Sequence, residues 1–234
     1  MRKIFTLTIS LFLFQNICFS QVEKPNLVGK QRVERVDEKL FNKETGKKMT
    51  AEELALLLKE TPGLQLIPEF NRFGKVEKYF YDPSNPFYDR KRDPSKSPKI
   101  GEFFPEFTFT TNQDKTFPIE DLKDSWIVIQ FQSFPAMTNE KHLKKLKEDI
   151  LNLKNQKIKI NSFIVFSYDD DIDFLINEYQ DAFHFVMNGT GFNEMFHITN
   201  FPSTFLIDPE GIIKKTFFGF DKVEIKSLFN SDQY

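Results

Sequence analysis

The side chains best placed for chemistry are two hydroxyls and a histidine where an apolar stretch meets an amphipathic one. WIVIQF at 126–131 is followed by QSFPAMTNE, so that Ser133 and Thr138 precede a helix that contains His142. A hydroxyl becomes a nucleophile when a base such as histidine activates it, and a helix start can also bind an anion. Threonine is also a common N-cap residue, and we predict this capping role for Thr138.

A metal site is the second candidate. Glu194 and His197 are three residues apart on an expected short helix, and His184 lies on an expected neighbouring strand. Carboxylate and imidazole ligands suit zinc, but this spacing matches no common metal motif. The acidic run at 169–173 suggests calcium, yet it lacks the glycine and distal glutamate of a calcium loop. We therefore predict no metal and no cofactor, and we place these acids at the start of a helix, whose dipole favours them.

Alternating strands and helices would position these residues from about residue 99 onward. WIVIQF is almost continuously apolar, which is typical of a strand buried on both faces. A helix is expected after it, because apolar residues recur there every three or four positions: Leu143, Leu146, Ile150 and Leu153. Further strands are expected at 106–111, 159–167, 183–187 and on both sides of a turn at Asp208–Gly211, and further helices at 169–179, 191–196 and 221–230. The pattern predicts an α/β fold with a mixed central sheet and helices on both faces.

A small helix and hairpin are expected ahead of this domain. MTAEELALLLKETPG has Thr50 as an N-cap, Glu53 to complete a capping box and a Pro-Gly pair to end the helix. LQLIPEFNRFGKVEKYFYDP predicts a hairpin with its turn at Asn71–Gly74, and Pro68 confines the first strand to an edge. An apolar stripe on the helix must pack on something, and it consists of Leu54, Leu57 and Leu58.

The chain divides into a signal peptide at 1–20, an N-terminal extension at 21–81, a Pro-rich linker at 82–98 and the α/β domain at 99–234. Residues 21–49 carry no strong periodic signal apart from a turn at Gly46, and most of them are expected to be extended or mobile. In the linker, Arg90, Lys91 and Arg92 are flanked by Asp89 and Asp93, so we predict a solvated segment rather than an anion site.

The N-terminus predicts export. MRKIFTLTISLFLFQNICFSQ has two basic residues, a short apolar run and a polar end, which is the layout of a secretory signal peptide. The run is shorter than the roughly 20 residues that a membrane-spanning helix needs, so no transmembrane segment is expected after cleavage. Cys18 is the single cysteine of the chain. It would leave with the signal peptide, and the alternative is that it carries a lipid. The expected location is the periplasm or cell envelope of a bacterium.

Composition excludes one class of partner. The formal net charge is −2 at pH 7, and it falls to −4 when Arg2 and Lys3 leave with the signal peptide, so no basic excess suggests nucleic acid. The 29 phenylalanines fall mostly in strand-like runs. Aromatic side chains carry large apolar areas, and we therefore assign them to the core rather than to a stacking surface.

Several of these stretches together resemble one family. KIGEFFPEFTF, WIVIQF, a turn and helix carrying Glu140, FIVFSYDD and FPSTFLIDPEGIIKKTFFG are similar to the thioredoxin-like proteins of bacterial envelopes, the TlpA/ResA and AhpC/TSA (redoxin) group. The resemblance covers about residues 99–230. It implies a thioredoxin-like fold in which Pro202 forms a cis peptide bond beside the active site.

The chemistry of that family needs a cysteine at the start of the helix after the WIVIQF-type strand, where the helix N-terminus lowers the pKa of the thiol. A second cysteine in the turn lets the pair cycle between dithiol and disulfide. Here, Phe131 and Glu140 align with the family pattern, the turn between them is about two residues short, and neither cysteine is present. Met137 cannot replace them, because an oxidised methionine needs an outside enzyme to recover. We therefore predict a redox-inactive protein.

Three functions remain open. The first is a binding or assembly module for an extended peptide or envelope protein, in which Phe201 would offer backbone hydrogen bonds, as the resemblance implies. Its candidate binding residues are Phe201, Pro202, Phe134, Pro135, Met137 and Thr138. The second is a thiol–disulfide oxidoreductase or peroxiredoxin-type antioxidant protein, as the family would suggest. The third is a structural partner whose N-terminal extension makes the interaction.

Overall fold

The computed structural model describes residues 36–89 and 91–219, together with Ile225 and Phe229. The predicted signal peptide with Cys18, Arg90 and most of the expected terminal helix lie outside the described residues. The described residues all belong to one compact unit.

A five-stranded mixed sheet lies at the centre, in the order β10-β9-β6-β7-β8. The strands β6 (Trp126–Gln132), β7 (Ile160–Phe166) and β8 (His184–Val186) are parallel. The strand β9 (Ser203–Ile207) is antiparallel to both β6 and β10 (Ile213–Phe218). The turn predicted between β9 and β10 is present, because the Gly211 N–H donates to the Asp208 carbonyl at 2.9 Å. The predicted α/β class is confirmed.

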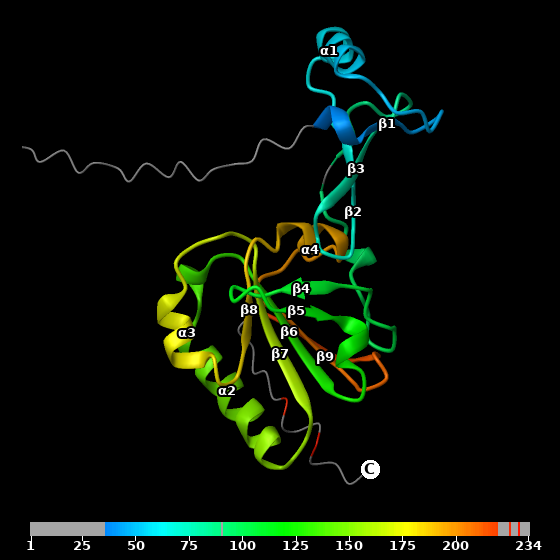
Figure 1. Ribbon diagram of the computed structural model, residues 1–234. Helices are drawn as coiled ribbons and strands as arrows, with labels where there is room; N and C mark the ends of the chain where they lie inside the picture. Colours follow the sequence, from blue (N-terminus) through cyan, green and yellow to red (C-terminus); the bar gives the residue numbers. More distant parts are fainter. Residues whose placement is uncertain (1–35, 90, 220–224, 226–228, 230–234) are drawn as a thin grey trace, which may run out of the picture. The chain divides into compact units, whose positions relative to one another are not determined.

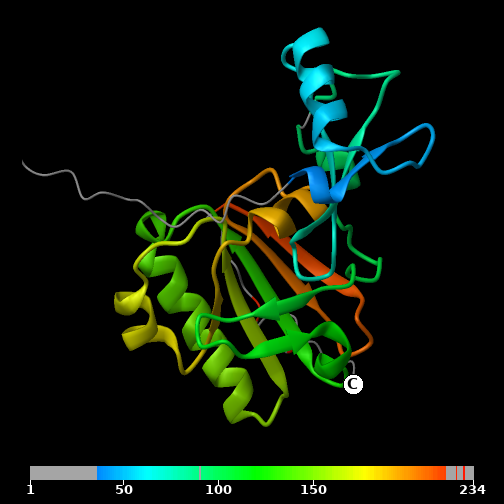
Figure 2. The same cartoon turned by 45° about the horizontal axis from the view of Figure 1, so that its top comes forward.

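Both faces of this sheet are covered. The helices α2 (Glu140–Asn155) and α3 (Asp173–Tyr179) lie together on one side of the central strands (Figure 1). The short helix α4 (Thr190–Met195) and the hairpin of β4 (Thr108–Thr110) and β5 (Thr116–Pro118) contribute to the other core cluster. Figure 2 shows this hairpin, in green, in front of the central strands. The sequence predicted β4 but not β5.

Alternate residues of β6 enter different cores, as the pleat of a strand requires. Val128 packs with the buried side of α2, whereas Ile127 and Ile129 pack with β4 and α4.

Seven phenylalanines are among the largest fully buried side chains: Phe107, Phe109, Phe131, Phe163, Phe166, Phe196 and Phe205. The prediction that phenylalanine builds the core is therefore confirmed at these positions.

The N-terminal extension contains the predicted helix and hairpin. The helix α1 (Ala51–Glu60) has the capping box of Thr50 and Glu53 with both hydrogen bonds formed. The hairpin strands β2 (Ile67–Phe70) and β3 (Val76–Tyr81) form a sheet with β1 (Leu40–Asn42) in the order β1-β3-β2. The strand β2 therefore lies at an edge, as Pro68 predicted.

Two details of this extension differ from what the sequence indicated. In the described part of the segment expected to be mostly extended or mobile, β1 (Leu40–Asn42) pairs in parallel with β3 and Leu40 is fully buried. The leucine stripe of α1 is only partly used: Leu54 and Leu57 pack on the small core around Leu40, but Leu58 is 48% exposed.

The tip of the β2–β3 hairpin contacts the α/β domain closely. The Arg72 carbonyl accepts a hydrogen bond of 2.7 Å from the Thr108 N–H. An added Cβ at Gly191 of α4 would lie only 1.7 Å from the Gly74 carbonyl oxygen. The extension is therefore attached to α4 and β4 through backbone contacts that leave no room for a side chain at Gly191.

Candidate functional site

The carboxyl ends of β6 and β7 and the start of β9 bring the candidate residues to one edge of the central sheet. The turn 133–139 leaves β6, the loop 167–172 leaves β7, and Phe201-Pro202 enters β9. Because β6 and β7 are parallel and β9 is antiparallel to β6, these three segments meet at the same edge. We refer to them as the loop edge.

The turn after β6 begins with a short 3₁₀ helix, Pro135–Met137, and not directly with α2. Thr138 closes this turn with its N–H, which donates to the Pro135 carbonyl at 3.0 Å. The N-cap of α2 is Asn139, whose side chain accepts a hydrogen bond from the His142 N–H at 3.0 Å. The prediction that Thr138 caps this helix is therefore wrong by one residue, because the 3₁₀ turn delays the helix start.

The Thr138 hydroxyl instead joins a network of buried amides. It donates to Gln132 Oε1 at 3.2 Å, and Gln132 Nε2 donates to Gln130 Oε1 at 2.9 Å. The amide nitrogen of Gln130 then contacts Thr204 Oγ1 at 3.0 Å and His142 Nε2 at 2.9 Å. Gln130 is fully buried, so each of these bonds offsets the desolvation of a polar group.

This network does not form a catalytic hydroxyl site. Nε2 of His142 faces the Gln130 amide, and burial lowers the pKa of His142 below 6.5. The Thr138 hydroxyl donates to an amide oxygen and not to a base. The sequence did carry a signal for the network: Gln130 and Gln132 are two polar residues on the same face of an otherwise apolar strand.

Two aromatic rings form an exposed platform on the loop edge. Phe134 and Tyr168 stack with their ring centroids 4.5 Å apart and their planes inclined by 12°. Their exposed fractions are 41% and 48%, and the neighbouring Met137 is 68% exposed. Pro135 is buried, so it cannot supply the binding surface that the sequence suggested. The contribution of Tyr168 was not predicted, because it lies on a different loop.

The peptide bond between Phe201 and Pro202 is cis, as the resemblance implied. Pro202 is buried, and its carbonyl accepts a hydrogen bond of 2.8 Å from the Gly219 N–H. On the other side of β9, the ladder between β6 and β9 ends at the pair of Phe131 and Ser203. Within the described part of the chain, the backbone N–H and C=O of Phe201 make no hydrogen bond. Phe201 therefore offers an unpaired backbone donor and acceptor beside the end of a strand.

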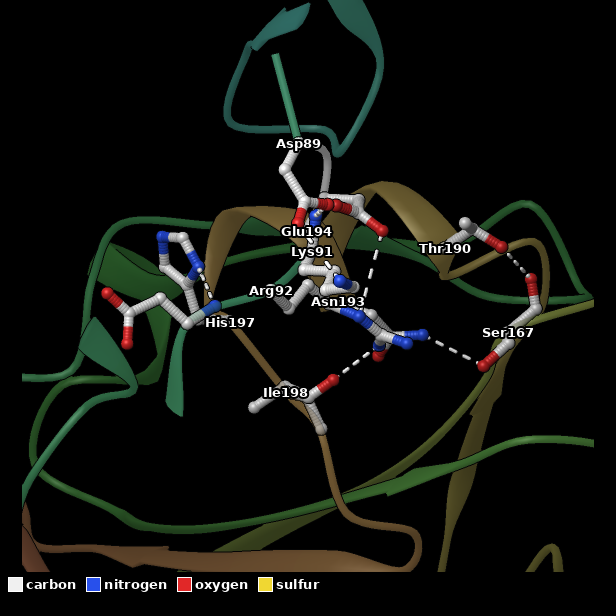
Figure 3. Close-up of polar contacts among 10 residues, drawn as sticks. Asp89, Lys91, Arg92, Ser167, Thr190, Asn193, Glu194, His197 and Ile198 are labelled. Carbon is white, nitrogen blue, oxygen red and sulfur yellow. Dashed lines mark hydrogen bonds and ion pairs between the residues drawn. The ribbon is translucent and has the colours of Figure 1, made fainter. Parts of the chain in front are cut away.

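Arg92 connects the linker to the loop that precedes Phe201. Its guanidinium lies 5.5 Å from the centroid of the Phe201 ring, its Nε is 3.7 Å from a carboxylate oxygen of Glu194, and it donates to the Ile198 carbonyl. Figure 3 shows Arg92 between Glu194 and Ile198, with Asn193 donating to Ser167 beside them. The expectation that Arg92 is solvated is therefore wrong, because its side chain anchors the linker to the loop before Phe201.

The three residues considered as metal ligands do not converge. His184 packs against the Phe117 ring, with centroids 4.5 Å apart. His197 accepts a hydrogen bond through Nδ1 from the Asp93 N–H at 3.2 Å, and Glu194 pairs with Arg92. Among the residues that the structure describes, no group of three or more histidine, cysteine, aspartate or glutamate side chains is arranged to hold a metal ion.

The strand order, the cis-proline before β9 and the helices on both faces define a thioredoxin-like fold. No protein-family model matches the chain, and no curated protein matches it either. The thioredoxin domain of a thiol-disulfide oxidoreductase from Bacteroides vulgatus is similar in structure, with a TM-score of 0.47 and 20% identity over 57% of this chain and 99% of that domain.

Two further solved structures have comparable scores. A member of the Sco family of cytochrome c oxidase assembly proteins gives a TM-score of 0.46 at 17% identity, covering 57% of this chain and 94% of the other. A putative thioredoxin from Neisseria meningitidis gives 0.45 at 21% identity, covering 58% and 93%.

Proposed function

We propose that this chain is a redox-inactive binding module of the bacterial cell envelope, similar to the TlpA/ResA and AhpC/TSA group, which docks an extended peptide segment of another protein at the loop edge. The peptide main chain would pair with the backbone of Phe201. Its side chains would contact the platform of Phe134 and Tyr168, with Met137 beside it.

The observation that carries the proposal is the unpaired backbone of Phe201. Strand addition needs a donor and an acceptor on an accessible backbone. The ladder between β6 and β9 ends at the pair Phe131 and Ser203, and no described residue pairs with the backbone of Phe201. The exposed rings next to the β6 turn add apolar contact area at a position where the family carries its thiols.

A thiol–disulfide oxidoreductase is the second candidate, because two proteins of similar structure, from Bacteroides vulgatus and Bacteroides fragilis, are thiol-disulfide oxidoreductases. The cysteine content of the chain argues against oxidoreductase activity. A dithiol cycle needs two cysteines, whereas the chain has one, Cys18, and the turn 133–139 has none. Reduction of a disulfide substrate by the purified protein would establish this second function.

An envelope location rests on the signal-peptide pattern at residues 1–20. None of the helices in residues 36–89 and 91–219 has both the length and the apolar character needed to cross a membrane. Signal-sequence cleavage after Ser20 would leave the mature protein without cysteine, and mass spectrometry of the exported protein tests this directly.

Site-specific photo-crosslinking tests the function. A photoreactive residue at Met137 should capture a partner in envelope extract, and the same residue at Leu56, which is 55% exposed on α1, serves as the control site. Phe201→Asp and Phe134→Asp should each abolish capture at 137 while the variants keep a cooperative unfolding transition. Capture at 56 alone would contradict the proposal and assign the interaction to the N-terminal extension.

A further inference from the structure

The charge of the loop edge restricts the kind of segment that it can bind. The segments 133–139, 167–173, 187–190 and 199–202 gather at the carboxyl ends of β6, β7 and β8 and at the start of β9. Together they contain four aspartates and no lysine or arginine: Asp169, Asp170, Asp171 and Asp173. All four are exposed. A partner that approaches this edge therefore meets a negative potential.

The aspartates are not neutralised by ion pairs. None of the ion pairs between described residues involves them. Asp170 and Asp171 each accept a backbone N–H at 2.9 Å, from Asp171 and Asp173 respectively, so these two carboxylates also shape the loop. An asparagine can keep such a bond without the charge.

Two basic residues on segments that adjoin the loop edge each have an acidic neighbour. Arg92 contacts the Phe201 ring, but it is paired with Glu194. Lys141 in the first turn of α2 stands next to Glu140 in the sequence. The aromatic platform, in contrast, is directly continuous with the acids, because Asp169 follows Tyr168.

An exposed aromatic pair beside unpaired carboxylates favours cations. A lysine or arginine head group is attracted by the face of an aromatic ring and by the carboxylates, while its aliphatic stem packs on the ring. In an extended peptide, alternate side chains point the same way. A segment paired with Phe201 can therefore direct its apolar side chains to one face and its basic side chains to the opposite face.

We propose that the occupant of the loop edge is an extended peptide segment in which lysine or arginine alternates with apolar residues. Its apolar side chains lie on Phe134 and Tyr168, and its cations face Asp169, Asp170 and Asp171. The inference rests on the proposed function, and it adds the chemistry of the partner.

Two synthetic peptides test it by fluorescence anisotropy at low ionic strength: one alternates lysine with phenylalanine and valine, and the other has glutamate in place of every lysine. The lysine peptide should bind about tenfold tighter, and the triple change Asp169→Asn, Asp170→Asn, Asp171→Asn should remove this preference. A tenfold change corresponds to about 1.4 kcal/mol, which three exposed ion pairs of ordinary strength supply. The matched control removes three exposed carboxylates elsewhere: Glu44→Gln, Glu60→Gln and Glu148→Gln.

The outcomes separate this inference from the proposed function. If both peptides bind equally and Phe201→Asp weakens both, the groove binds peptide but the charge inference is wrong. If the control triple weakens the lysine peptide as much as the aspartate triple does, the attraction is a property of the net charge and the inference is also wrong. If neither peptide binds, both proposals fail.

Discussion

Gly191→Ala tests the contact between the N-terminal extension and the α/β domain. An alanine Cβ there would lie 1.7 Å from the Gly74 carbonyl oxygen and 2.6 Å from its carbonyl carbon. No rotamer relieves a backbone clash, so α4 or the hairpin tip must move. Overpacking of this kind costs about 1–3 kcal/mol. Without the contact, alanine in a helix would instead stabilise the protein by up to about 1 kcal/mol relative to glycine.

The sign of the change in unfolding free energy is therefore diagnostic. The overpacking cost less the helix gain leaves a net loss of up to about 3 kcal/mol in unfolding free energy, so urea denaturation of the full protein should show a lower midpoint for Gly191→Ala. Combining it with Arg72→Ala, which removes the arginine side chain that bonds Glu120 and the Phe107 carbonyl, should reduce this cost, because the hairpin tip can then move away. A stabilised Gly191→Ala protein would refute the docked arrangement.

Three further changes test the loop edge and the groups behind it. Gln130→Leu should destabilise the protein by about 1–3 kcal/mol in urea denaturation, because it leaves buried hydrogen-bond partners unpaired; an unchanged midpoint would show that the amide network is dispensable. Burial lowers the pKa values of His142 and His184 below 6.5, so the unfolded state binds more protons and stability should fall as the pH drops below about 6.5. His142→Gln should flatten this dependence, and an identical pH profile would contradict the assignment. Arg92→Met removes the pair with Glu194 and should speed amide exchange in residues 197–201; unchanged exchange rates would show that the linker does not hold this loop.

Local signals in the sequence predicted the elements whose causes are local. The capping box at Thr50 predicted the start of α1, the apolar run 126–131 predicted β6, and Pro68 predicted an edge strand. Each of these depends on residues within one turn of helix or one strand. The family resemblance also predicted the cis bond before Pro202.

Features that depend on distant partners were missed. The strand β1 has three residues and is held by pairing of Leu40 with Tyr79, far along the chain. The stack of Phe134 on Tyr168 joins two loops, and Arg92 is fixed by the Glu194 carboxylate and the Ile198 carbonyl. No periodicity or motif in one segment encodes such contacts, because their partners are set by the tertiary fold. The sequence placed Phe134, Met137 and Phe201 among the candidate residues, but the stack of Phe134 on Tyr168 could not be predicted from it.

The most direct test of a peptide-binding edge is amide hydrogen exchange at Phe201, measured by NMR with and without the peptide segment that crosslinks at position 137. The free protein should exchange this amide rapidly, because the described residues provide no acceptor for it. Binding should protect Phe201 strongly and leave a remote exposed amide such as Glu44 unchanged. A bound peptide that leaves the exchange of Phe201 unaltered would contradict strand addition at this edge.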